Sequence, residues 1–525
     1  MKALTESDVP RAPSLDPRQT RRWAAIAGVV SAVITLAVAE VVALLVGGRG
    51  NPLLAVGSLI IDVVPTGVKT LVIELFDTAD KLVLFLSLGV LVLILAALVG
   101  VLEQRRRFVG TAVLGLVGII ALIAAVTRAE ATFLDAIPTL VGVLAGIRLL
   151  RVLITRLNRW QKAPTPISGT PFERRSFLRL AVAMGVTGVV VGAIARSVSA
   201  ASAAVQQVRG SIRLPKAAVA AVALPAGAEL DVPGISPFAT PNAEFYRIDT
   251  ALQVPSIDPS SWKLRITGMV EQDIEITYDD LIKLPLEEHW VTLACVSNEV
   301  GGGLIGNALW LGYPIRTLLE RAKPMRGADM VLSSSSDGFS AGTPLSVLQD
   351  ENTDAIFAVG MNGEPLPLDH GFPVRMVVPG LYGYVSATKW VTTLEVTTFA
   401  QKMGYWTPRG WSALGPVKVS SRIDTPTRQV TAGTVAVAGV AWAQHTGISR
   451  VEVRIDDGDW REATLARAVS TDTWLQWSYA WDAVAGAHEI TVRATDADGL
   501  VQTAQQAPVA PDGATGLHRV RVSVT

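Results

Sequence analysis

The sequence predicts a protein of three parts: an α-helical transmembrane bundle of about five spans, then an α+β domain, then an all-β sandwich. Three observations favour this fold class. Residues 22–200 are almost continuously apolar. Residues 262–268 and 274–278 alternate apolar and polar side chains, which is typical of half-buried strands. From about residue 415 onward, short strand-like runs follow one another with turn residues between them.

Composition and charge exclude several classes of protein. The 525 residues are 50% hydrophobic, and the mean hydropathy of +0.39 is too high for an ordinary soluble protein. The formal net charge of zero argues against a polyanionic partner, so we expect no binding to nucleic acid. A single cysteine excludes a disulfide scaffold and any cage of four thiolates around zinc or an iron–sulfur cluster.

The apolar part contains stretches long enough to cross a bilayer, for which a helix needs about 20 mostly apolar residues. The predicted spans are residues 23–45, 82–102, 108–126, 131–150 and 180–197. A further apolar stretch, residues 52–76, carries Asp62, Pro65, Lys69 and Glu74. It is either a sixth span or a helix that lies at the membrane surface.

Positive charge chooses between these alternatives, because Lys and Arg near span ends stay on the cytoplasmic side. If residues 52–76 do not cross, the arginine clusters within 11–22, 105–107 and 151–175 all fall on one side of the membrane. We therefore expect five spans with the N-terminus in the cytoplasm. The chain after residue 200 then lies outside the cytoplasm, and the expected localisation is the plasma membrane.

The segment Glu-Arg-Arg-Ser-Phe-Leu-Arg at 173–179 precedes the last apolar run and resembles a twin-arginine export signal placed inside the chain. The alternative is that Arg174 and Arg175 only keep this end of the span in the cytoplasm, and the sequence leaves both open. None of the five histidines lies in a predicted span, so we expect no transmembrane haem.

Changes in composition set the expected domain boundaries. They are 1–22 for a cytoplasmic tail, 23–155 for transmembrane helices, 156–200 for a cytoplasmic loop with the twin-arginine-like motif and the last span, 201–236 for a linker, 237–412 for the α+β domain and 413–525 for the β-sandwich. The linker is assigned because its sequence is rich in Pro, Gly and Ala.

The only cysteine, Cys295, closes an apolar run, residues 290–295, that is typical of a strand. A lone thiol cannot form an intrachain disulfide. Its thiolate can ligate a soft or redox-active metal, or act as a nucleophile; the alternative is a small buried apolar residue. Glycines 301–303 permit close backbone approach to a ligand. Without a following Lys-Ser/Thr they form no phosphate-binding P-loop.

Six segments between about residues 240 and 410 carry distinctive motifs. They are Phe245-Tyr-Arg-Ile-Asp (245–249), the stretch around Cys295 (292–312), Ser336-Asp-Gly-Phe (336–339), Met361-Asn-Gly-Glu-Pro-Leu-Pro-Leu-Asp-His-Gly-Phe-Pro-Val-Arg (361–375), Val-Val-Pro-Gly-Leu-Tyr-Gly (377–383) and Lys389-Trp390. In order and approximate spacing they resemble the molybdenum domain of the sulfite oxidase family. The resemblance implies an α+β domain of the sulfite-oxidase type. It also implies Mo-molybdopterin, the molybdenum cofactor, with the Cys295 thiolate as metal ligand.

The resemblance further implies which side chains bind the cofactor. They are Phe245, Arg247, Asn298, Asp337, His370, Arg375 and Lys389. The chemistry agrees, because a molybdopterin phosphate favours Arg and Lys, and a histidine can donate a hydrogen bond to the pterin or its phosphate. A carboxylate can accept from pterin N–H groups. Taken singly, each charged residue is better explained as a solvated charge or a turn former; only the combination indicates a site.

The chain departs from sulfite oxidases on the substrate side. Those that resemble it follow the ligand cysteine with Gly-Asn-Arg-Arg, whereas this chain has Ser-Asn-Glu-Val at 297–300. Trp411 stands where the family places an active-site tyrosine, and a tryptophan cannot relay a proton as a phenol does. Arg247 alone clearly remains of the anion-binding set. We therefore expect a substrate other than sulfite, with Cys295, Arg247 and Trp411 in catalytic roles.

The C-terminal part resembles the immunoglobulin-like dimerisation domain of sulfite oxidases, through Gly-Val-Ala-Trp at 439–442 and Arg-Ala-Thr-Asp-Ala-Asp-Gly at 493–499. The predicted strands are 429–440, 447–455, 474–481, 488–494 and 518–525, with a hairpin turn at 456–460. The tryptophans expected to pack in the core or hairpins, rather than bind a ligand, are Trp460, Trp474, Trp477 and Trp481. A homodimer follows from the resemblance alone.

Together these features predict a membrane-anchored oxidoreductase that carries out two-electron oxygen-atom transfer at a molybdenum ligated by Cys295. Its expected partners are a small-molecule substrate, a cytochrome or quinone-linked protein as redox partner, and the lipid bilayer. The sequence leaves the direction of oxygen-atom transfer open: the protein is either an oxidase or a reductase of sulfoxide- or N-oxide-like groups. The alternative is a non-catalytic membrane receptor or scaffold with an extracytoplasmic β-sandwich, which leaves Cys295, His370 and Arg375 unexplained.

Overall fold

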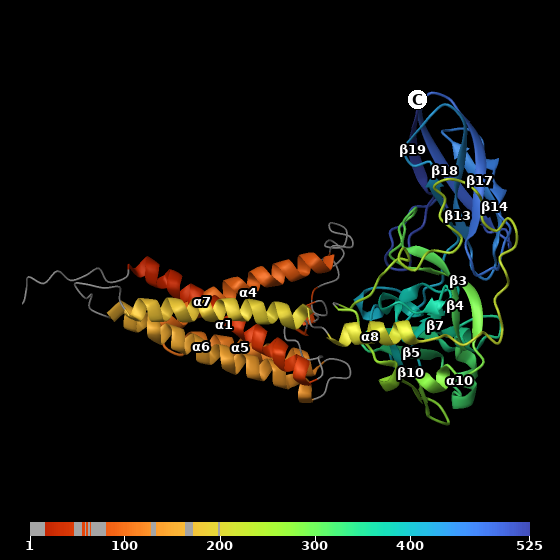
Figure 1. Ribbon diagram of the computed structural model, residues 1–525. Helices are drawn as coiled ribbons and strands as arrows, with labels where there is room; N and C mark the ends of the chain where they lie inside the picture. The colour runs from red at the N-terminus through yellow and green to blue at the C-terminus, as the bar shows by residue number, and fades with distance from the viewer. Residues whose placement is uncertain are drawn as a thin grey trace, which may run out of the picture. The chain divides into compact units, whose positions relative to one another are not determined.

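The computed structural model describes residues 16–46, 55–57, 59–60, 64, 80–127, 133–162, 172–197, 200–251 and 253–525. The chain forms two compact units, Met1–Ala201 and Ser202–Thr525, which Figure 1 draws from red to yellow and from yellow to blue. The first unit is helical, and the second contains an α+β domain followed by a β-sandwich.

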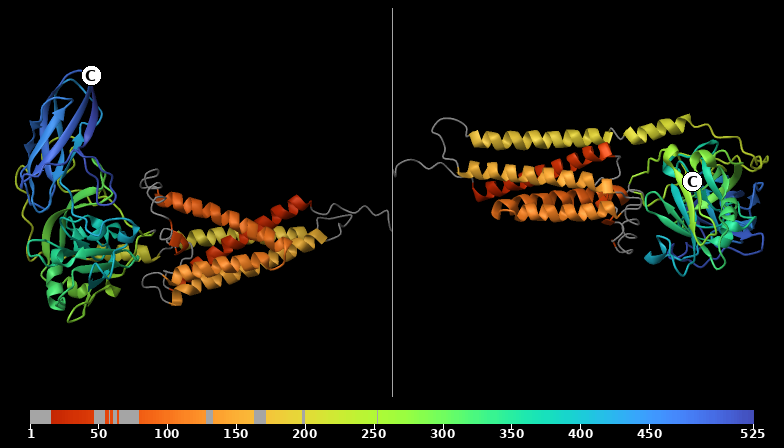
Figure 2. Two further views of the ribbon diagram at one scale, coloured as in Figure 1. Left: turned by 180° about the vertical axis from the view of Figure 1, so that it is seen from behind. Right: turned by 90° about the horizontal axis from the view of Figure 1, so that it is seen from below.

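The first unit is a bundle of long helices. In its described residues these are α1 Pro17–Val46, α4 Asp80–Arg105, α5 Val109–Val126, α6 Ala136–Lys162 and α7 Phe172–Ser197, with a short 3₁₀ helix at Phe133–Asp135. Helix α1 packs against α4, α6 and α7, and α5 packs against α4 and α6. Both views in Figure 2 show these helices running side by side.

Four helical segments among the described residues are long and apolar enough to cross a membrane. They are Pro17–Ala43, Leu86–Arg105, Val109–Val126 and Ala136–Gln161. They coincide with four of the five predicted spans. Helix α7 covers the fifth, 180–197, and its first turn carries the exposed Arg174 and Arg175. The stretch 52–76 lies mostly outside the described residues.

Helix α6 is longer than the predicted span. The boundary expected at 155/156 falls inside the helix, which continues to Lys162. The reason is that Leu153, Ile154 and Leu157 remain buried against neighbouring helices after the first arginines of this segment. The uniformly apolar run ends at the first arginines, but one face of the helix stays apolar after them. Burial of this face continues the helix to Lys162.

Helices α1 and α4 cross at close range through two glycines. A Cβ atom on Gly28 would overlap the carbonyl oxygen of Ala96, and one on Gly100 would overlap that of Ala24. Backbones approach this closely only where side chains are absent, as in the small-xxx-small contacts of membrane helices.

We expect Gly28→Val to destabilise the bundle by about 1–3 kcal/mol, because overpacking at this crossing forces the backbones apart. Gly89→Val on α4 is the matched control, because a Cβ atom there meets no atom within 4 Å. Thermal unfolding of the full chain in detergent measures both variants. Equal unfolding temperatures for the two would contradict the close crossing.

The segment predicted as a linker, 201–236, begins with a helix, which corrects that expectation. Helix α8 spans Ala200–Ser211, and its Ala, Val and Gln residues are compatible with helix formation. Val205 packs into a core cluster of the second unit, and Arg209 donates to the carbonyl oxygens of 365–366 at 2.7 and 2.8 Å. These contacts order the start of the segment, whereas its remainder, 212–236, contains no helix or strand.

The α+β domain contains two sheets with short helices on them. The first sheet has the order β2-β1-β10-β5-β6, and the second has the order β3-β4-β7-β8 with β9 beside β7. The strands are β1 Lys263–Gly268, β2 Ile274–Thr277, β3 Glu287–Ala294, β4 Ile305–Pro314, β5 Met330–Ser335, β6 Ser340–Pro344, β7 Ile356–Met361, β8 Glu364–Pro365, β9 Arg375–Val377 and β10 Val391–Thr397. The helices are α9 Tyr278–Leu281, α10 Ile315–Ala322 and α11 Leu345–Gln349, with 3₁₀ helices at Pro259–Ser261, Leu368–His370, Gly383–Val385 and Thr407–Arg409.

The core of this domain joins both sheets. One apolar cluster buries Trp262, which directly precedes β1 of the first sheet, Leu318 on α10 and Phe357 on β7 of the second sheet. The two strands predicted from alternation, 262–268 and 274–278, are β1 and β2, and they pair antiparallel. Burial of one face of each strand explains why the alternation was readable in the sequence.

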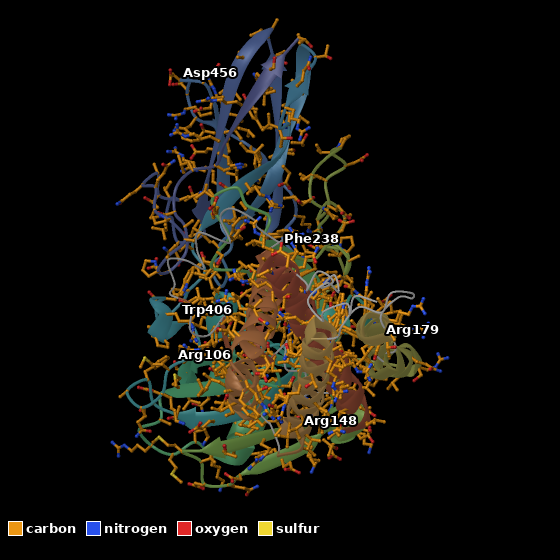
Figure 3. All side chains as sticks on the ribbon, turned by 90° about the vertical axis from the view of Figure 1, so that its left-hand side faces the viewer. Arg106, Arg148, Arg179, Phe238, Trp406 and Asp456 are labelled. Carbon is orange, nitrogen blue, oxygen red and sulfur yellow. The ribbon has the colours of Figure 1, made fainter. Side chains whose placement is uncertain are left out.

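The β-sandwich contains two sheets, with the orders β11-β13-β17-β16 and β12-β19-β18-β14-β15. Its strands are β11 Ser420–Thr425, β12 Gln429–Val430, β13 Gly433–Trp442, β14 Ile448–Ile455, β15 Arg461–Glu462, β16 Thr464–Leu465, β17 Leu475–Ala483, β18 Gly486–Asp496 and β19 Arg519–Val524. The five predicted strands are all present, although 429–440 is divided between β12 and β13. The predicted hairpin turn at Asp456 lies near the outer end of the sandwich (Figure 3).

The sandwich tryptophans pack as expected. Trp474, Trp477 and Trp481 are buried. Trp460 is half-buried, with the guanidinium groups of Arg454 and Arg493 lying 4.9 and 4.3 Å from its ring centroid. All four rings therefore have packing partners, which favours the structural interpretation of these residues.

Candidate active site

Cys295 lies directly after β3, at the start of a loop that ends at Leu304. The residue is 9% exposed. Its N–H donates to the carbonyl oxygen of Leu304 at 2.9 Å, and the N–H of Ser297 donates to its sulfur at 3.4 Å. Burial raises the pKa of the thiol, and the hydrogen bonds from Ser297 work against this rise. Cys295 is therefore a buried thiol whose ionised form needs a metal or a positive charge to stabilise it.

The loop after Cys295 is closed by its own polar groups. The side-chain oxygen of Asn298 accepts from the N–H of Leu304 at 2.8 Å, and the Asn298 N–H donates to the carbonyl oxygen of Cys295 at 3.0 Å. Asn298 was predicted to bind the cofactor, and the structure shows that its side-chain oxygen is used to hold this loop. A direct contact to the cofactor stays a prediction.

Arg375, at the start of β9, is a buried cation. It is 5% exposed, and its guanidinium carbon lies 5.1 Å from the centroid of the Trp310 ring. It donates to the carbonyl oxygens of His370 and Met376, both at 3.3 Å. No carboxylate pairs with it in the described part of the chain. Burial lowers the pKa of Arg375 to about 10, so the group stays protonated at neutral pH.

A second group of charges surrounds Asp249. Its carboxylate lies 2.7 Å from Nζ of Lys389 and 2.9 Å from Nε of Arg247. Burial lowers the pKa of Lys389 to about 8, although Asp249 opposes this fall. The sequence indicated Arg247 and Lys389 but not Asp249, which links them. Its position two residues after Arg247 was the only signal, and that signal is not specific.

His370 and Phe245 lie beside these charges. The Phe245 ring meets the His370 ring edge to face at 5.6 Å and the Trp310 ring at 5.7 Å. Nε2 of His370 lies 3.1 Å from the carbonyl oxygen of Asn242, which can only accept, so this nitrogen carries the proton. Burial and the two neighbouring cations lower the pKa of His370 to about 4, so the ring is neutral at physiological pH.

Asp337 is engaged within its own turn. One carboxylate oxygen accepts from the N–H of Phe339 at 3.1 Å, and the other accepts from the hydroxyl of Thr250 at 3.3 Å. Through Thr250 the turn contacts the segment that carries Arg247. The predicted bond from the pterin to Asp337 stays a prediction.

Trp411 belongs to an aromatic cluster beside the cysteine. Its ring centroid lies 5.9 Å from that of Tyr384 and 6.1 Å from that of Trp406. The same apolar cluster contains the two residues that flank Cys295 in the sequence. Trp411 therefore packs against the same apolar cluster as the neighbours of Cys295, and its role as a wall of the site stays a prediction.

Two tyrosines that the sequence did not indicate lie near the thiol. Burial raises the pKa of Tyr382 to about 12 and also raises the pKa of Tyr246, and negative charge on Cys295 adds to the rise in both. Arg375 acts in the opposite direction on the pKa of Tyr246. The phenol of Tyr246 thus lies within electrostatic reach of Cys295 and Arg375 together. A phenol is therefore present near the thiol although Trp411 replaces the expected one.

We expect anion binding at this site to weaken as the pH rises through about 8, where Lys389 loses its charge. Because its folded-state pKa is lowered, the buried charge opposes folding below pH 8, and folding stability improves as the pH rises toward the ordinary lysine pKa. Calorimetric titration of the cofactor-free chain with sulfate, an anion whose charge does not change between pH 6.5 and 9.5, measures the binding. Lys389→Met should remove the pH dependence, and Lys402→Met, at an exposed lysine, should keep it. A flat profile for the wild type would contradict this assignment.

Comparison with known proteins agrees with the site. The family model described as "Oxidoreductase molybdopterin binding domain" matches residues 251–406, and that described as "Bacterial Ig domain" matches residues 420–492. Mitochondrial sulfite oxidase of Rattus norvegicus is 31% identical over 272 residues, which is 43% of this chain and 49% of the rat protein. Residues 251–406 therefore contain a molybdopterin-binding oxidoreductase domain that is similar to the one in sulfite oxidases.

Other relatives of the chain are likewise covered only in part. Homo sapiens sulfite oxidase is 29% identical over 324 residues, 52% of this chain and 58% of the human protein. NADH nitrate reductase of Solanum lycopersicum is 28% identical over 308 residues, 46% of this chain and 34% of the plant protein. The chain spans about half the length of the rat sulfite oxidase. Among solved structures, sulfane dehydrogenase SoxCD from Paracoccus pantotrophus aligns with a TM-score of 0.49 and 22% identity, covering 55% of this chain and 81% of that one.

The family match covers part of the predicted site. Residues 251–406 include Cys295, His370, Arg375 and Lys389. Phe245 and Arg247 precede this range and Trp411 follows it, so their assignment depends on the motif at 245–249 and on the packing described above. The prediction of a sulfite-oxidase-type molybdopterin domain followed by an immunoglobulin-like domain is confirmed.

Proposed function

We propose that this chain catalyses two-electron oxygen-atom transfer, with Mo-molybdopterin in the α+β domain and Cys295 as the metal ligand. The observation that carries the proposal is Arg375, a buried guanidinium without a carboxylate partner among the described residues. An unpaired buried charge is costly, so this position favours an anionic ligand. A cofactor that carries a phosphate supplies such an anion.

The residues fit this cofactor in charge and in ligand type. A phosphate favours the guanidinium fork of an arginine and the point charge of a lysine, which Arg375 and Lys389 offer from buried positions. A soft thiolate suits a redox-active metal, and Cys295 offers one at the end of a strand. The chemistry that the cofactor supplies when bound is two-electron transfer of an oxygen atom.

The protein's own residues would hold and shield the reacting centre. His370 is neutral and donates through Nε2 to Asn242, which fixes its ring beside Phe245. Asp249 favours the charged form of Lys389 and keeps its ammonium group in place. The apolar cluster that contains Ala294 and Val296 and packs against Trp411 would exclude water from the neighbourhood of the thiol, which would strengthen electrostatic interactions there.

We propose a small, polar substrate other than sulfite. Arg247, the candidate for binding an anionic substrate, lies 2.9 Å from the carboxylate of Asp249 and 3.6 Å from that of Asp369. These carboxylates compensate its charge, and Glu299 adds negative charge in the loop after the cysteine. A neutral sulfoxide- or N-oxide-like group, or its reduced form, is therefore favoured over a dianion.

We propose that the helical unit anchors the chain in the plasma membrane, with the second unit outside the cytoplasm. Leu91 and Leu98 on α4, and Ile119 and Ile123 on α5, are about half exposed. Lipid accommodates such faces, whereas water penalises them. The proposed orientation of the helices in the membrane follows from the distribution of the arginines. Arg174 is cytoplasmic in this orientation, as an export signal at 173–179 would also require. A cytochrome or quinone-linked protein as redox partner, and a homodimer, are part of the same proposal.

Metal analysis of the full-length chain, produced in a host that makes the cofactor, tests the function. We expect molybdenum and a phosphate-bearing pterin in equimolar amounts with the chain. Assays with redox dyes against sulfite, sulfoxides and N-oxides then identify the substrate class and the direction, and we expect sulfite to be a poor substrate. A chain without molybdenum, pterin or turnover would instead support the receptor or scaffold alternative.

A further inference from the structure

Arg422, on β11 of the sandwich, contacts the loop that follows Cys295. Its Nη1 donates to the carbonyl oxygen of Gly302 at 2.9 Å, and its Nη2 donates to the hydroxyl of Ser236 at 2.8 Å. Its Nε pairs with the carboxylate of Asp424 at 2.6 Å. Arg422 is 9% exposed, so these are buried, charge-assisted hydrogen bonds in three fixed directions. One of them ends on the backbone of the cysteine loop.

His518, directly before β19, contacts the same loop. A Cβ atom on Gly301 would overlap the His518 ring, so the imidazole packs directly on the Gly301 backbone. Nδ1 of His518 accepts from the N–H of Ile423 at 2.9 Å, which fixes the ring. Gly301 has φ +81°, a conformation that favours glycine. The loop and the sandwich fit together only because residue 301 has no side chain.

The sandwich also holds the strand that leads into Cys295, on the side of the α+β domain that adjoins the sandwich in Figure 1. The contacts meet at Thr292 on β3, a fully buried residue. Its hydroxyl accepts from the N–H of Trp474 at 2.8 Å, and its carbonyl oxygen accepts from the side chain of Gln444 at 2.8 Å. Its N–H donates to the carbonyl oxygen of Asp472 at 3.0 Å.

We propose that Arg422 is a positioning residue for Cys295 and that the sandwich determines where the thiol lies. The sandwich contacts the backbone on both sides of Cys295, at Thr292 and at 301–302. A loop with three consecutive glycines loses much conformational entropy when it is ordered, and these bonds offset that loss. The inference rests on the proposed role of Cys295 as metal ligand, but it can be tested on the free thiol.

The reactivity of Cys295 gives a direct measurement, because it is the only cysteine in the chain. We expect Arg422→Met to raise the rate at which iodoacetamide alkylates the cofactor-free, full-length chain by at least tenfold. Arg521→Met, at an exposed arginine on β19 of the same sandwich, should leave the rate within twofold of the wild type. Arg422→Lys keeps the positive charge but cannot donate in all three directions. Its alkylation rate should lie between those of Arg422→Met and the wild type.

A second pair of variants applies if Arg422→Met does not fold. Gly301→Ala places a methyl group against His518 and should raise the alkylation rate. His518→Ala removes the ring, so the double variant should recover part of the protection. Wild-type rates in both Arg422→Met and Gly301→Ala would overturn the proposal, whatever the chain catalyses. Raised rates in a protein that never contains molybdenum would support this positioning role and count against the proposed function.

Discussion

Cys295→Ser is expected to abolish turnover while leaving the fold intact. A serine hydroxyl fits the space of the thiol, but it stays protonated and is a hard oxygen donor, so it does not replace a thiolate ligand. Changing a residue that only orients a metal ligand lowers metal affinity or activity by roughly 10–100-fold. Loss of the ligand itself should therefore lower the activity by more than about 100-fold. Turnover with a redox dye, molybdenum content and thermal unfolding of the full chain measure the three effects.

Ser297→Ala is the matched control for this loop. Ser297 donates to the cysteine sulfur from its backbone N–H, which alanine retains, so this variant loses only the side-chain hydrogen bond of Ser297 to the sulfur. We expect this variant to keep most of the activity and its molybdenum. If Cys295→Ser turns over substrate at the wild-type rate, the thiolate has no catalytic role and the proposed mechanism is wrong.

Arg375→Met is expected to have opposite effects on function and on folding. Methionine fills a similar apolar volume but removes the cation, so the chain should lose affinity for an anionic cofactor and most of its activity, by about 100-fold or more. The cofactor-free chain should become more stable by about 1–4 kcal/mol, because a buried charge without an acidic partner is removed.

Arg321→Met, at an exposed arginine in the last turn of α10, is the control. It should change neither pterin content nor stability measurably, as expected for a surface charge. Urea unfolding of cofactor-free protein and pterin analysis of loaded protein are the two measurements. An Arg375→Met variant that retains the full amount of pterin would show that this guanidinium does not neutralise the cofactor phosphate.

Short motifs indicated four candidate side chains of the site, whose roles stay predictions. Cys295, His370, Arg375 and Lys389 stand in segments whose order and residue types are specific, and the family match covers all four. The segments at 361–375 and 377–383 are rich in Pro and Gly, so their turns are encoded by neighbouring residues. Local geometry is encoded by neighbouring residues, which is why the sequence alone indicates it.

Other site residues could not be found in this way, because their roles depend on distant parts of the chain. Asp249 pairs with Lys389, which lies 140 residues further along. Tyr246 and Tyr382 reach the thiol from segments on either side of it in the sequence. Asn298 was assigned to the cofactor from its place in the motif, whereas its side-chain oxygen holds the N–H of Leu304.

The sequence by itself determined the three-part architecture and the chemical character of the site, because burial and periodicity appear directly in the order of apolar residues. Only the tertiary structure decided how charge is compensated: Arg247 and Lys389 share Asp249, while Arg375 has no acidic partner among the described residues. It also decided that Arg422 and His518 of the sandwich contact the cysteine loop. Charge pairing and domain contacts depend on distances between residues far apart in the chain, and no local pattern contains those distances.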